Sequence, residues 1–199
     1  MRANPGFENQ KTAGPYPSRM IAIVFRPLQR ADFALLARWL AEPHVAKWWQ
    51  SPATAEYVEE HYGPRVDALE PTEVFVIEVD GMPGGIIQRY LLADYPGWAS
   101  AIGLVDAAGI DYLIGEVELT GKGLGTRAIG QFTARVWERY PHVTVVVAAP
   151  QQANVASWKA LERAGFERTW AGQLDSDDPS DEGPSYVYSL QRPIGVESR

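Results

Sequence analysis

Apolar positions along the chain follow two spacings, one typical of strands and one typical of helices. Alternating or continuous β-branched runs predict strands over residues 21–26, 73–79, 86–92, 110–117, 142–148 and 186–190. Apolar residues three and four positions apart predict helices over residues 31–40, 54–69, 126–140 and 154–164, the second broken at Gly63-Pro64. A turn is expected at residues 80–84 and a loop at residues 93–109. This order of elements predicts an α/β fold.

The predicted elements lie between residues 21 and 191, where we expect a single domain. The chain of 199 residues is 46% hydrophobic, which is enough for one substantial core. Residues 1–20 are rich in proline, glycine and asparagine without periodicity, and we expect a loose N-terminal arm there. Residues 192–199 are expected to form a C-terminal tail.

Composition narrows the classes of site and partner. The absence of cysteine excludes disulfides, thiolate catalysis and cysteine-ligated zinc, and it is compatible with a reducing cytoplasm. The N-terminal segment lacks the apolar core of a signal peptide, and the longest apolar run, residues 143–150, is far shorter than the ~20 residues of a membrane helix. His44, His61 and His142 show no metal-ligand spacing. We expect a soluble cytoplasmic monomer or homodimer with no metal site and no membrane partner.

Acidic residues are concentrated in one segment near the C-terminus. The net charge is −7, and the segment DSDDPSDE carries Asp175, Asp177, Asp178, Asp181 and Glu182 with no basic residue. Repulsion from phosphates argues against a nucleic-acid partner, whereas a cationic ligand would be attracted. A solvated surface loop without a ligand is the alternative.

The segment ELTGKGLGTRAIGQF, residues 118–132, contains three glycines within five residues. A glycine-rich loop between a strand and a helix exposes backbone N–H groups at a helix N-terminus, which favours a phosphate. The spacing does not fit a Walker loop, and Thr126 stands where a dinucleotide fingerprint requires its last glycine. A glycine-rich turn without a ligand is the alternative.

The run Thr120-Gly-Lys-Gly-Leu-Gly125 resembles the pyrophosphate-binding loop of the GNAT N-acetyltransferases, although Thr120 departs from the usual Gln or Arg. The segment from Asn154 to Ser157 and the later Gly165-Phe166 are similar to a second coenzyme A-binding block of that superfamily. The resemblance implies a mixed, mostly antiparallel central sheet flanked by helices, and acetyl-CoA as cofactor. It also implies cofactor contacts from Glu116, Val117, Gly121, Lys122, Gly123, Leu124, Gly125, Thr126, Asn154 and Ser157.

Further motifs resemble the aminoglycoside 6'-N-acetyltransferases. These are Trp48-Trp49, Gly109-Ile-Asp111 and the run Gly-Lys-Gly-Leu-Gly-Thr that ends at Thr126. The match covers roughly residues 20–190, and siderophore-type lysine N-acyltransferases share parts of it. The resemblance implies a small cationic amine as substrate, bound by Trp48, Trp49, Gln88, Tyr90, Trp98, Asp111 and Glu182.

The resemblance assigns Asp111 as the residue that orients the substrate ammonium and accepts its proton, with Glu116 as the second candidate. Without cysteine, direct attack by the amine in a ternary complex is simpler than an acetyl-enzyme. Backbone N–H groups of residues 115–117 would bind the thioester carbonyl oxygen if the strand is splayed there, as in the superfamily.

Several positions depart from these families. Leu161 stands where the superfamily has a tyrosine that protonates the leaving thiolate, so water, Tyr186 or Tyr188 would have to replace it. Pro96 and Ala149 stand where the aminoglycoside enzymes have acids, and Asp94 and Asp106 are candidate substitutes. Two alternatives stay open. One is acylation of a lysine side chain, a siderophore precursor or a protein N-terminus, and the other is a CoA-binding sensor without turnover.

Overall fold

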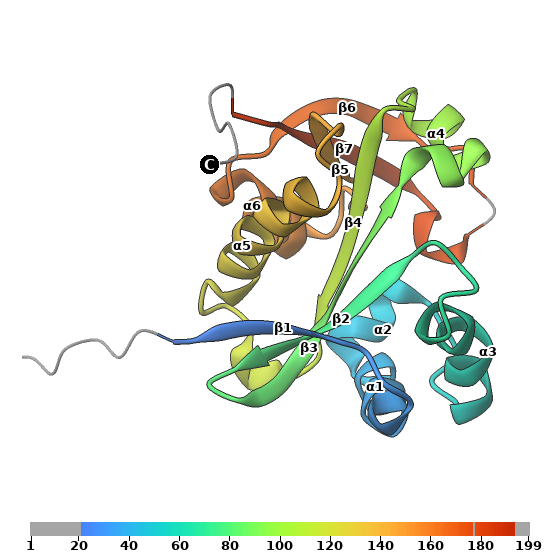
Figure 1. Cartoon of the computed structure of the whole chain (residues 1–199), viewed down its shortest axis with the longest axis vertical. Coiled ribbons are helices and arrows are strands. Elements are labelled where there is room, and N and C mark those ends of the chain that lie inside the picture. Colours follow the sequence, from blue (N-terminus) through green and yellow to red (C-terminus); the bar gives the residue numbers. More distant parts are fainter. Residues whose placement is uncertain (1–20, 177, 194–199) are drawn as a thin grey trace, which may run out of the picture.

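The computed structural model describes residues 21–176 and 178–193, so the predicted arm, most of the predicted tail and Asp177 lie outside the described residues. The described strands form one sheet in the order β1-β2-β3-β4-β5-β7-β6. All neighbouring strands are antiparallel except β4 and β5, which are parallel. The strands are β1 (Ile23–Pro27), β2 (Glu73–Val79), β3 (Met82–Leu91), β4 (Ala107–Ile114), β5 (Val145–Ala148), β6 (Glu167–Gln173) and β7 (Pro184–Gln191). The sheet is therefore mixed and mostly antiparallel, as predicted (Figure 1).

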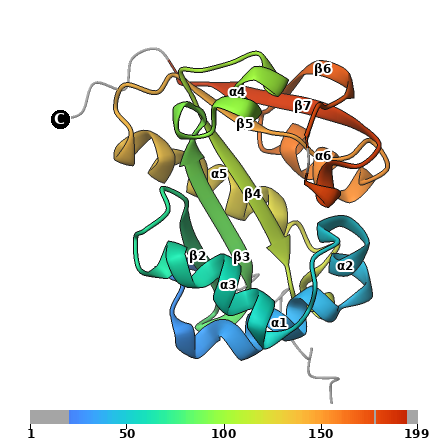
Figure 2. The same ribbon diagram turned by 90° about the vertical axis from the view of Figure 1, so that its right-hand side faces the viewer.

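Helices cover both faces of this sheet. They are α1 (Phe33–Ala41), α2 (Pro43–Trp49), α3 (Ala55–Val66), α4 (Pro96–Ile102), α5 (Leu124–Arg139) and α6 (Val155–Arg163). Helices α5 and α6 lie on one face, and α1, α2 and α3 lie on the other, in front of the sheet in Figure 2. Period-two alternation along the strands sends neighbouring side chains to opposite faces, and each face therefore has its own core.

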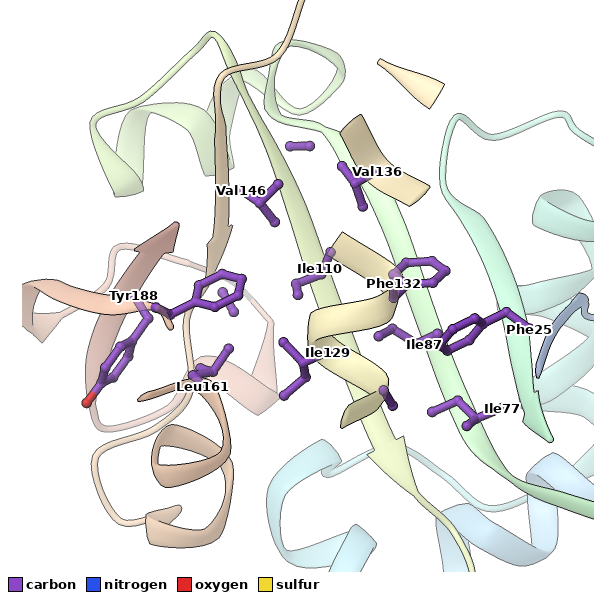
Figure 3. Packing of buried hydrophobic residues seen from close by; sticks show 14 of the residues in the cluster. Phe25, Ile77, Ile87, Ile110, Ile129, Phe132, Val136, Val146, Leu161 and Tyr188 are labelled. Atoms are coloured by element: carbon purple, nitrogen blue, oxygen red, sulfur yellow. The ribbon is translucent and has the colours of Figure 1, made fainter. Parts of the chain in front are cut away.

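The larger core lies beneath α5 and α6. Phe132 of α5 contacts Phe25 of β1 with ring centroids 5.1 Å apart, and Ile129 of α5 and Leu161 of α6 are fully buried in the same cluster (Figure 3). The opposite core packs α1, α2 and α3 against the other faces of β2, β3 and β4, with Trp39 completely buried at its centre. Burial of this apolar surface is the main force that holds the helices on the sheet.

The parallel pair β4–β5 has the fewest paired residues of any neighbouring strands in the sheet. Among the described residues its ladder has only the pairs Ala107–Val145, Ala108–Val146 and Gly109–Val147. The remainder of β4 stays paired with β3 as far as Ile114, so β4 and β5 separate after Gly109. This separation leaves residues 110–114 without a partner on the β5 side. The opening thus lies before residues 115–117, where the splayed strand was expected, and the N–H groups of Gly115 and Glu116 donate to the Gly84 carbonyl oxygen instead.

The structure differs from the sequence expectation in several elements. Helices α2 and α4 were not predicted, although Pro43 and Pro96 each occupy a first helical position, where the missing N–H has no cost. Strand β6 was missed because nearly all its side chains are exposed, so it lacks alternation. The break predicted at Gly63-Pro64 is wrong, since α3 continues through Pro64 to Val66.

Two boundaries also shift. The turn between β2 and β3 needs only Asp80 and Gly81, whose φ angles are 50° and 83°, so β3 begins at Met82 rather than at residue 86. Strand β4 ends at Ile114, and residues 117–119 form a single 3₁₀ turn instead of the predicted end of the strand.

Candidate active site

A pocket of about 370 Å³ opens where β4 and β5 separate. Its walls come from α2 and α3, from β3 and β4, from α4, from the start of α6 and from the acidic loop of residues 175–182. The pocket brings together Trp48, Trp49, Gln88, Tyr90, Trp98, Asp111, Asn154 and Ser157 of the predicted site residues. These residues are far apart in the sequence, and the pairing of β3 with β4 is what places the central ones side by side.

Asp111 is held by a chain of hydrogen bonds that begins on α3. The register of β3 and β4 places Gln88 directly opposite Asp111, and its Nε2 donates to Asp111 Oδ2 at 2.9 Å. Arg65 Nη1 donates to Gln88 Oε1 at 3.1 Å, which fixes the orientation of the amide. Gln88 was predicted to bind substrate, but its side chain is only 7% exposed and both ends of the amide are engaged. The geometry therefore supports a role for Gln88 in orienting Asp111 rather than in binding substrate.

Burial raises the pKa of Asp111, and the hydrogen bond from Gln88 opposes that rise. Arg65 also lowers this pKa, whereas the nearby Asp178 raises it. A carboxylate with a raised pKa is a stronger proton acceptor than an ordinary surface aspartate. The position and the environment of Asp111 thus both suit it to take a proton from an ammonium group.

Aromatic side chains form the wall next to Asp111. Trp98 Nε1 donates to Tyr90 Oη at 3.1 Å, which ties α4 to β3. Gly109 lies directly beneath the Tyr90 ring, since a Cβ at this position would approach the ring to 2.3 Å. The glycine of the predicted Gly-Ile-Asp motif therefore makes room for Tyr90, while Trp48 and Trp49 line the pocket from α2.

The acidic loop contributes carboxylates to the pocket, but they are not the expected ones. Asp178 and Asp181 line the pocket, whereas Glu182, which was expected to face the substrate, is exposed and outside its lining. Asp181 accepts a hydrogen bond from Ser176 Oγ at 2.6 Å, and burial raises its pKa to about 6. Asp181 is the last residue of the 3₁₀ turn Pro179–Asp181 and is half-buried, whereas Glu182, which directly follows that turn, is exposed.

The glycine loop precedes α5 and is open to solvent. Gly121 and Gly123 have φ angles of 69° and 75°, which side chains rarely adopt, and a Cβ on either would meet nothing within 4 Å. Leu124 is the first residue of α5 and is buried in the core, which anchors the loop. The backbone N–H groups of the first helical turn have no partner within the helix and face this open space, so the loop fits a pyrophosphate.

Asn154 and Ser157 form the start of α6. Asn154 Oδ1 accepts a hydrogen bond from the Ser157 backbone N–H at 3.2 Å, so Asn154 caps the helix. The predicted cofactor contact of Asn154 is thus combined with a structural role. Of the other predicted contacts, Lys122 is exposed at the loop and Thr126 is half-buried in the first turn of α5.

Glu116 is engaged away from the pocket. Its Oε1 accepts a hydrogen bond from Trp39 Nε1 at 2.8 Å, and it forms an ion pair with Arg38. The hydrogen bond from Trp39, followed by that from Arg38, lowers the pKa of Glu116, which makes it a poor proton acceptor. Glu116, which was expected to be the second candidate base, is therefore not suited to that role.

The predicted tyrosine substitutes for Leu161 do not reach the pocket. Tyr188 Oη donates to Glu162 Oε1 at 2.9 Å, and in Figure 3 its hydroxyl points away from the core. Tyr186 packs edge-on against Trp158 and lies under Arg168, outside the pocket lining. Leu161 itself is fully buried.

A different tyrosine, Tyr112, does line the pocket. No role was assigned to Tyr112 from the sequence. Its position next to Asp111 on the predicted strand was the signal in the sequence.

The described residues contain no cluster of three or more histidine, aspartate or glutamate side chains suited to a metal ion. His44 Nε2 lies 2.9 Å from the Ile114 carbonyl oxygen, and His61 stacks on Tyr57 with ring centroids 3.8 Å apart. Within residues 21–176 and 178–193, no helix has the length and apolar character needed to cross a bilayer.

Comparisons with known proteins place this geometry among acetyltransferases. A family model described as an acetyltransferase (GNAT) domain matches residues 29–174. The aminoglycoside N(6')-acetyltransferase type 1 of Klebsiella pneumoniae is 30% identical over 174 residues, which cover 85% of this chain and 83% of that protein. The lysine N-acyltransferase MbtK of Mycolicibacterium paratuberculosis is 22% identical, covering 76% of this chain and 68% of that protein.

Among solved structures, aminoglycoside acetyltransferase AAC(6')-Ib in complex with coenzyme A and kanamycin superimposes with a TM-score of 0.74. It is 29% identical in sequence, and the match covers 86% of this chain and 95% of that one.

Proposed function

The chain belongs to the GNAT acetyltransferase family, and from this premise we propose that it is an acetyl-CoA-dependent N-acetyltransferase that acts on a primary amine of an aminoglycoside, at the 6' position. The observation that carries the proposal is the placement of Asp111. It lies in a pocket lined by carboxylates and tryptophans, where β4 separates from β5. The relatives named aminoglycoside N(6')-acetyltransferases support the same substrate class.

Acetyl-CoA supplies the acetyl group as a thioester. The glycine loop and the first turn of α5 would hold the pyrophosphate through backbone N–H groups, because Gly121 and Gly123 leave that surface open. Asn154 and Ser157 line the pocket from the start of α6 and would contact the pantetheine arm. The same proposal includes contacts to the cofactor from Glu116, Val117, Lys122 and Thr126, made by backbone atoms or by exposed side chains.

Asp111 would receive one proton from the bound ammonium, which exposes the nitrogen lone pair for attack on the thioester carbonyl. The carbonyl oxygen would be bound by backbone N–H groups on the open side of β4. Asp178 and Asp181 would attract the remaining ammonium groups of a polycationic substrate, since both carboxyl groups line the pocket near Asp111. Trp48, Trp49 and Trp98 would pack against sugar rings.

A lysine-type substrate is the second candidate, and Arg65 is the observation that favours it. Its guanidinium lines the same pocket as Asp111. A substrate that carries a carboxylate beside its amine could meet both charges, although it would share Arg65 with Glu70 and Gln88, which already engage this side chain. We further propose that the enzyme works in the cytoplasm as a monomer or homodimer without a nucleic-acid or membrane partner. The net charge of −7 supports the part of this proposal that concerns nucleic acid.

A thiol-release assay with acetyl-CoA would test the proposal against kanamycin, lysine and a peptide with a free N-terminus. Acetylation of kanamycin with little turnover of the other two is expected. Preference for lysine would favour the second candidate. Binding of CoA without turnover of any amine would favour a sensor.

Calorimetry of the loop variants gives an independent measurement. Gly123→Val places a β-branched side chain at a φ of 75° and should weaken CoA binding. Gly130→Ala is the matched control, because this exposed glycine of α5 has open space around a new Cβ. Equal CoA affinity in the two variants would contradict the assignment of the loop.

A further inference from the structure

The hydroxyl of Tyr112 connects the two sides of the gap between β4 and β5. Tyr112 Oη lies 2.8 Å from Ser157 Oγ and 3.3 Å from the Ser157 carbonyl oxygen. Tyr112 belongs to the part of β4 that has lost its β5 partner, while Ser157 lies in the first turn of α6, the helix that follows β5. Both residues line the pocket. The pair is therefore a hydroxyl bridge across the opening in the sheet.

The same strand presents a proton acceptor and a proton donor in consecutive residues. Asp111 is bonded to Gln88 on the β3 side, whereas Tyr112 reaches α6 on the other side. An amine that approaches Asp111 and a thioester that lies in the gap would thus meet between these two groups. Both residues line the same pocket where β4 separates from β5, so one strand can serve both reactants.

Other hydroxyl groups of the pocket are placed differently. Tyr57, Tyr62 and Tyr95 come from α3 and the segment before α4, and Tyr90 Oη accepts a hydrogen bond from Trp98. Tyr186 and Tyr188 lie outside the pocket lining. Among the described pocket tyrosines, Tyr112 is the one whose hydroxyl is bonded to α6.

We propose that Tyr112 is the donor that neutralises the departing thiolate of coenzyme A, with Ser157 as the residue that positions its hydroxyl. This inference rests on the proposed function and extends it, because it assigns to β4 a task that Leu161 on α6 has no group to perform.

The amine nitrogen forms a bond to the acetyl carbon, and the carbon–sulfur bond breaks with its electron pair passing to sulfur. Tyr112 gives its hydroxyl proton to that sulfur, and the second proton that the nitrogen loses on becoming an amide returns to the tyrosine oxygen. Asp111 has already taken the first proton, which it releases to solvent. The products are the N-acetyl amine and the free thiol, with one proton released.

The surroundings of Tyr112 keep its proton in place before the reaction. Burial raises the pKa of the phenol, the hydrogen bond with Ser157 opposes that rise, and the negative charge of Asp111 adds to it. The hydroxyl is therefore fully protonated at neutral pH. A donor of this kind first forms a hydrogen bond to the sulfur as negative charge develops there, which requires no ionisation of the free enzyme.

The test compares Tyr112→Phe with wild type in steady-state kinetics on the amine that the wild type acetylates. The variant keeps the ring and its packing but loses the hydroxyl, so kcat should fall by about 10²-fold with little change in the KM of acetyl-CoA. Ser157→Ala should lower kcat by a smaller factor, since it leaves the hydroxyl present but unpositioned. Tyr188→Phe is the matched control. It also removes the hydroxyl of a buried tyrosine, but that hydroxyl donates to Glu162 and lies outside the pocket.

A binding measurement provides a readout that does not depend on turnover. Calorimetry with CoA and with desulfo-CoA should show a preference for CoA in wild type that disappears in Tyr112→Phe and persists in Tyr188→Phe. Unchanged kcat together with an unchanged preference for CoA would overturn the inference while leaving the proposed function intact. A wild type that binds neither compound and acetylates nothing would instead overturn the proposed function itself.

Discussion

The two charged walls of the pocket use their charges differently. On the α3 wall, Arg65 donates to Gln88 and forms an ion pair with Glu70 at 3.1 Å. On the loop wall, neither Asp178 nor Asp181 belongs to any ion pair among the described residues, and Asp181 is bonded only to a serine hydroxyl. The α3 wall therefore has its charge already matched within the protein, whereas the loop wall has charge available for a ligand.

This contrast indicates a division of tasks. Matched charges hold a neighbouring group in one orientation, because their hydrogen bonds are made before any ligand arrives. Unmatched carboxylates at the edge of a pocket attract cations, and their effect is screened by salt. We therefore expect substitutions on the α3 side to alter the chemical step and substitutions on the loop side to alter substrate capture.

The largest effect should come from Asp111, which stands between the walls. Asp111→Asn keeps the size of the side chain but removes its basicity, so kcat/KM should fall by about 10²-fold or more. CoA affinity, measured by calorimetry, should stay near wild type. Asp175→Asn serves as control, since Asp175 is exposed and outside the pocket lining. Activity of Asp111→Asn close to wild type at neutral pH would mean that another group accepts the proton.

The next effect tests the α3 side. Gln88→Leu removes the donor to Asp111 Oδ2, and kcat should fall by roughly tenfold as the carboxylate loses its fixed orientation. The hydrogen bond from Gln88 opposes the raised pKa of Asp111, so its loss should raise that pKa further. Because Asp111 must be deprotonated to act, the acid limb of the pH profile of kcat/KM should move to higher pH.

If the acid limb of the pH profile of kcat/KM is the same in Gln88→Leu and in wild type, Gln88 does not influence the pKa of Asp111 in the reaction. A thermal melt of the variant would show whether a loss of activity reflects unfolding instead.

A smaller effect is expected on the loop side. Asp178→Asn combined with Asp181→Asn should raise the KM for kanamycin several-fold and flatten its dependence on salt, since exposed pairs contribute only ~0.2–1 kcal/mol each. The KM for acetyl-CoA should hardly change. The pKa of about 6 at Asp181 adds a pH signature. Below that pH the carboxyl is neutral, so the kanamycin KM of the wild type should fall as pH rises through 6, and the variant should lose this component.

The smallest effect should be that of Glu182→Gln. Glu182 is adjacent to Asp181 in the sequence but is exposed and outside the pocket lining, so the kanamycin KM should change by less than about twofold. Measured beside Asp181→Asn under the same salt conditions, it compares two neighbouring carboxylates that differ mainly in where they point. An equal rise in KM for both would show that the whole loop acts through its net charge.

The parts of the site that depend on local sequence were predictable. The glycine loop before a helix was expected from its glycines, two of which have positive φ angles, and the helix expected from residue 154 has Asn154 as its N-cap. The central strands and the core helices were also recovered, because their apolar periodicity is strong.

The parts that depend on distant contacts were not predictable from spacing. Strand register places Gln88 opposite Asp111, and no local sequence pattern predicts that pairing. Asp181 and Glu182 differ in burial at the end of one 3₁₀ turn, and the acidic run itself does not predict which of them is covered. Tyr112 was missed for a similar reason, since its partner Ser157 lies on another element.

The short ladder between β4 and β5 has a mechanical consequence. Strands β1 to β4 form one half of the sheet and β5 to β7 the other, and among the described strands only three residue pairs join them in register. A ligand that lies in the gap and contacts both β4 and α6 would link the two halves of the sheet. Its binding free energy would therefore add to the stability of their association. The free energy of unfolding would then rise with the logarithm of ligand concentration, and at a given concentration it would rise most for the ligand with the lowest Kd.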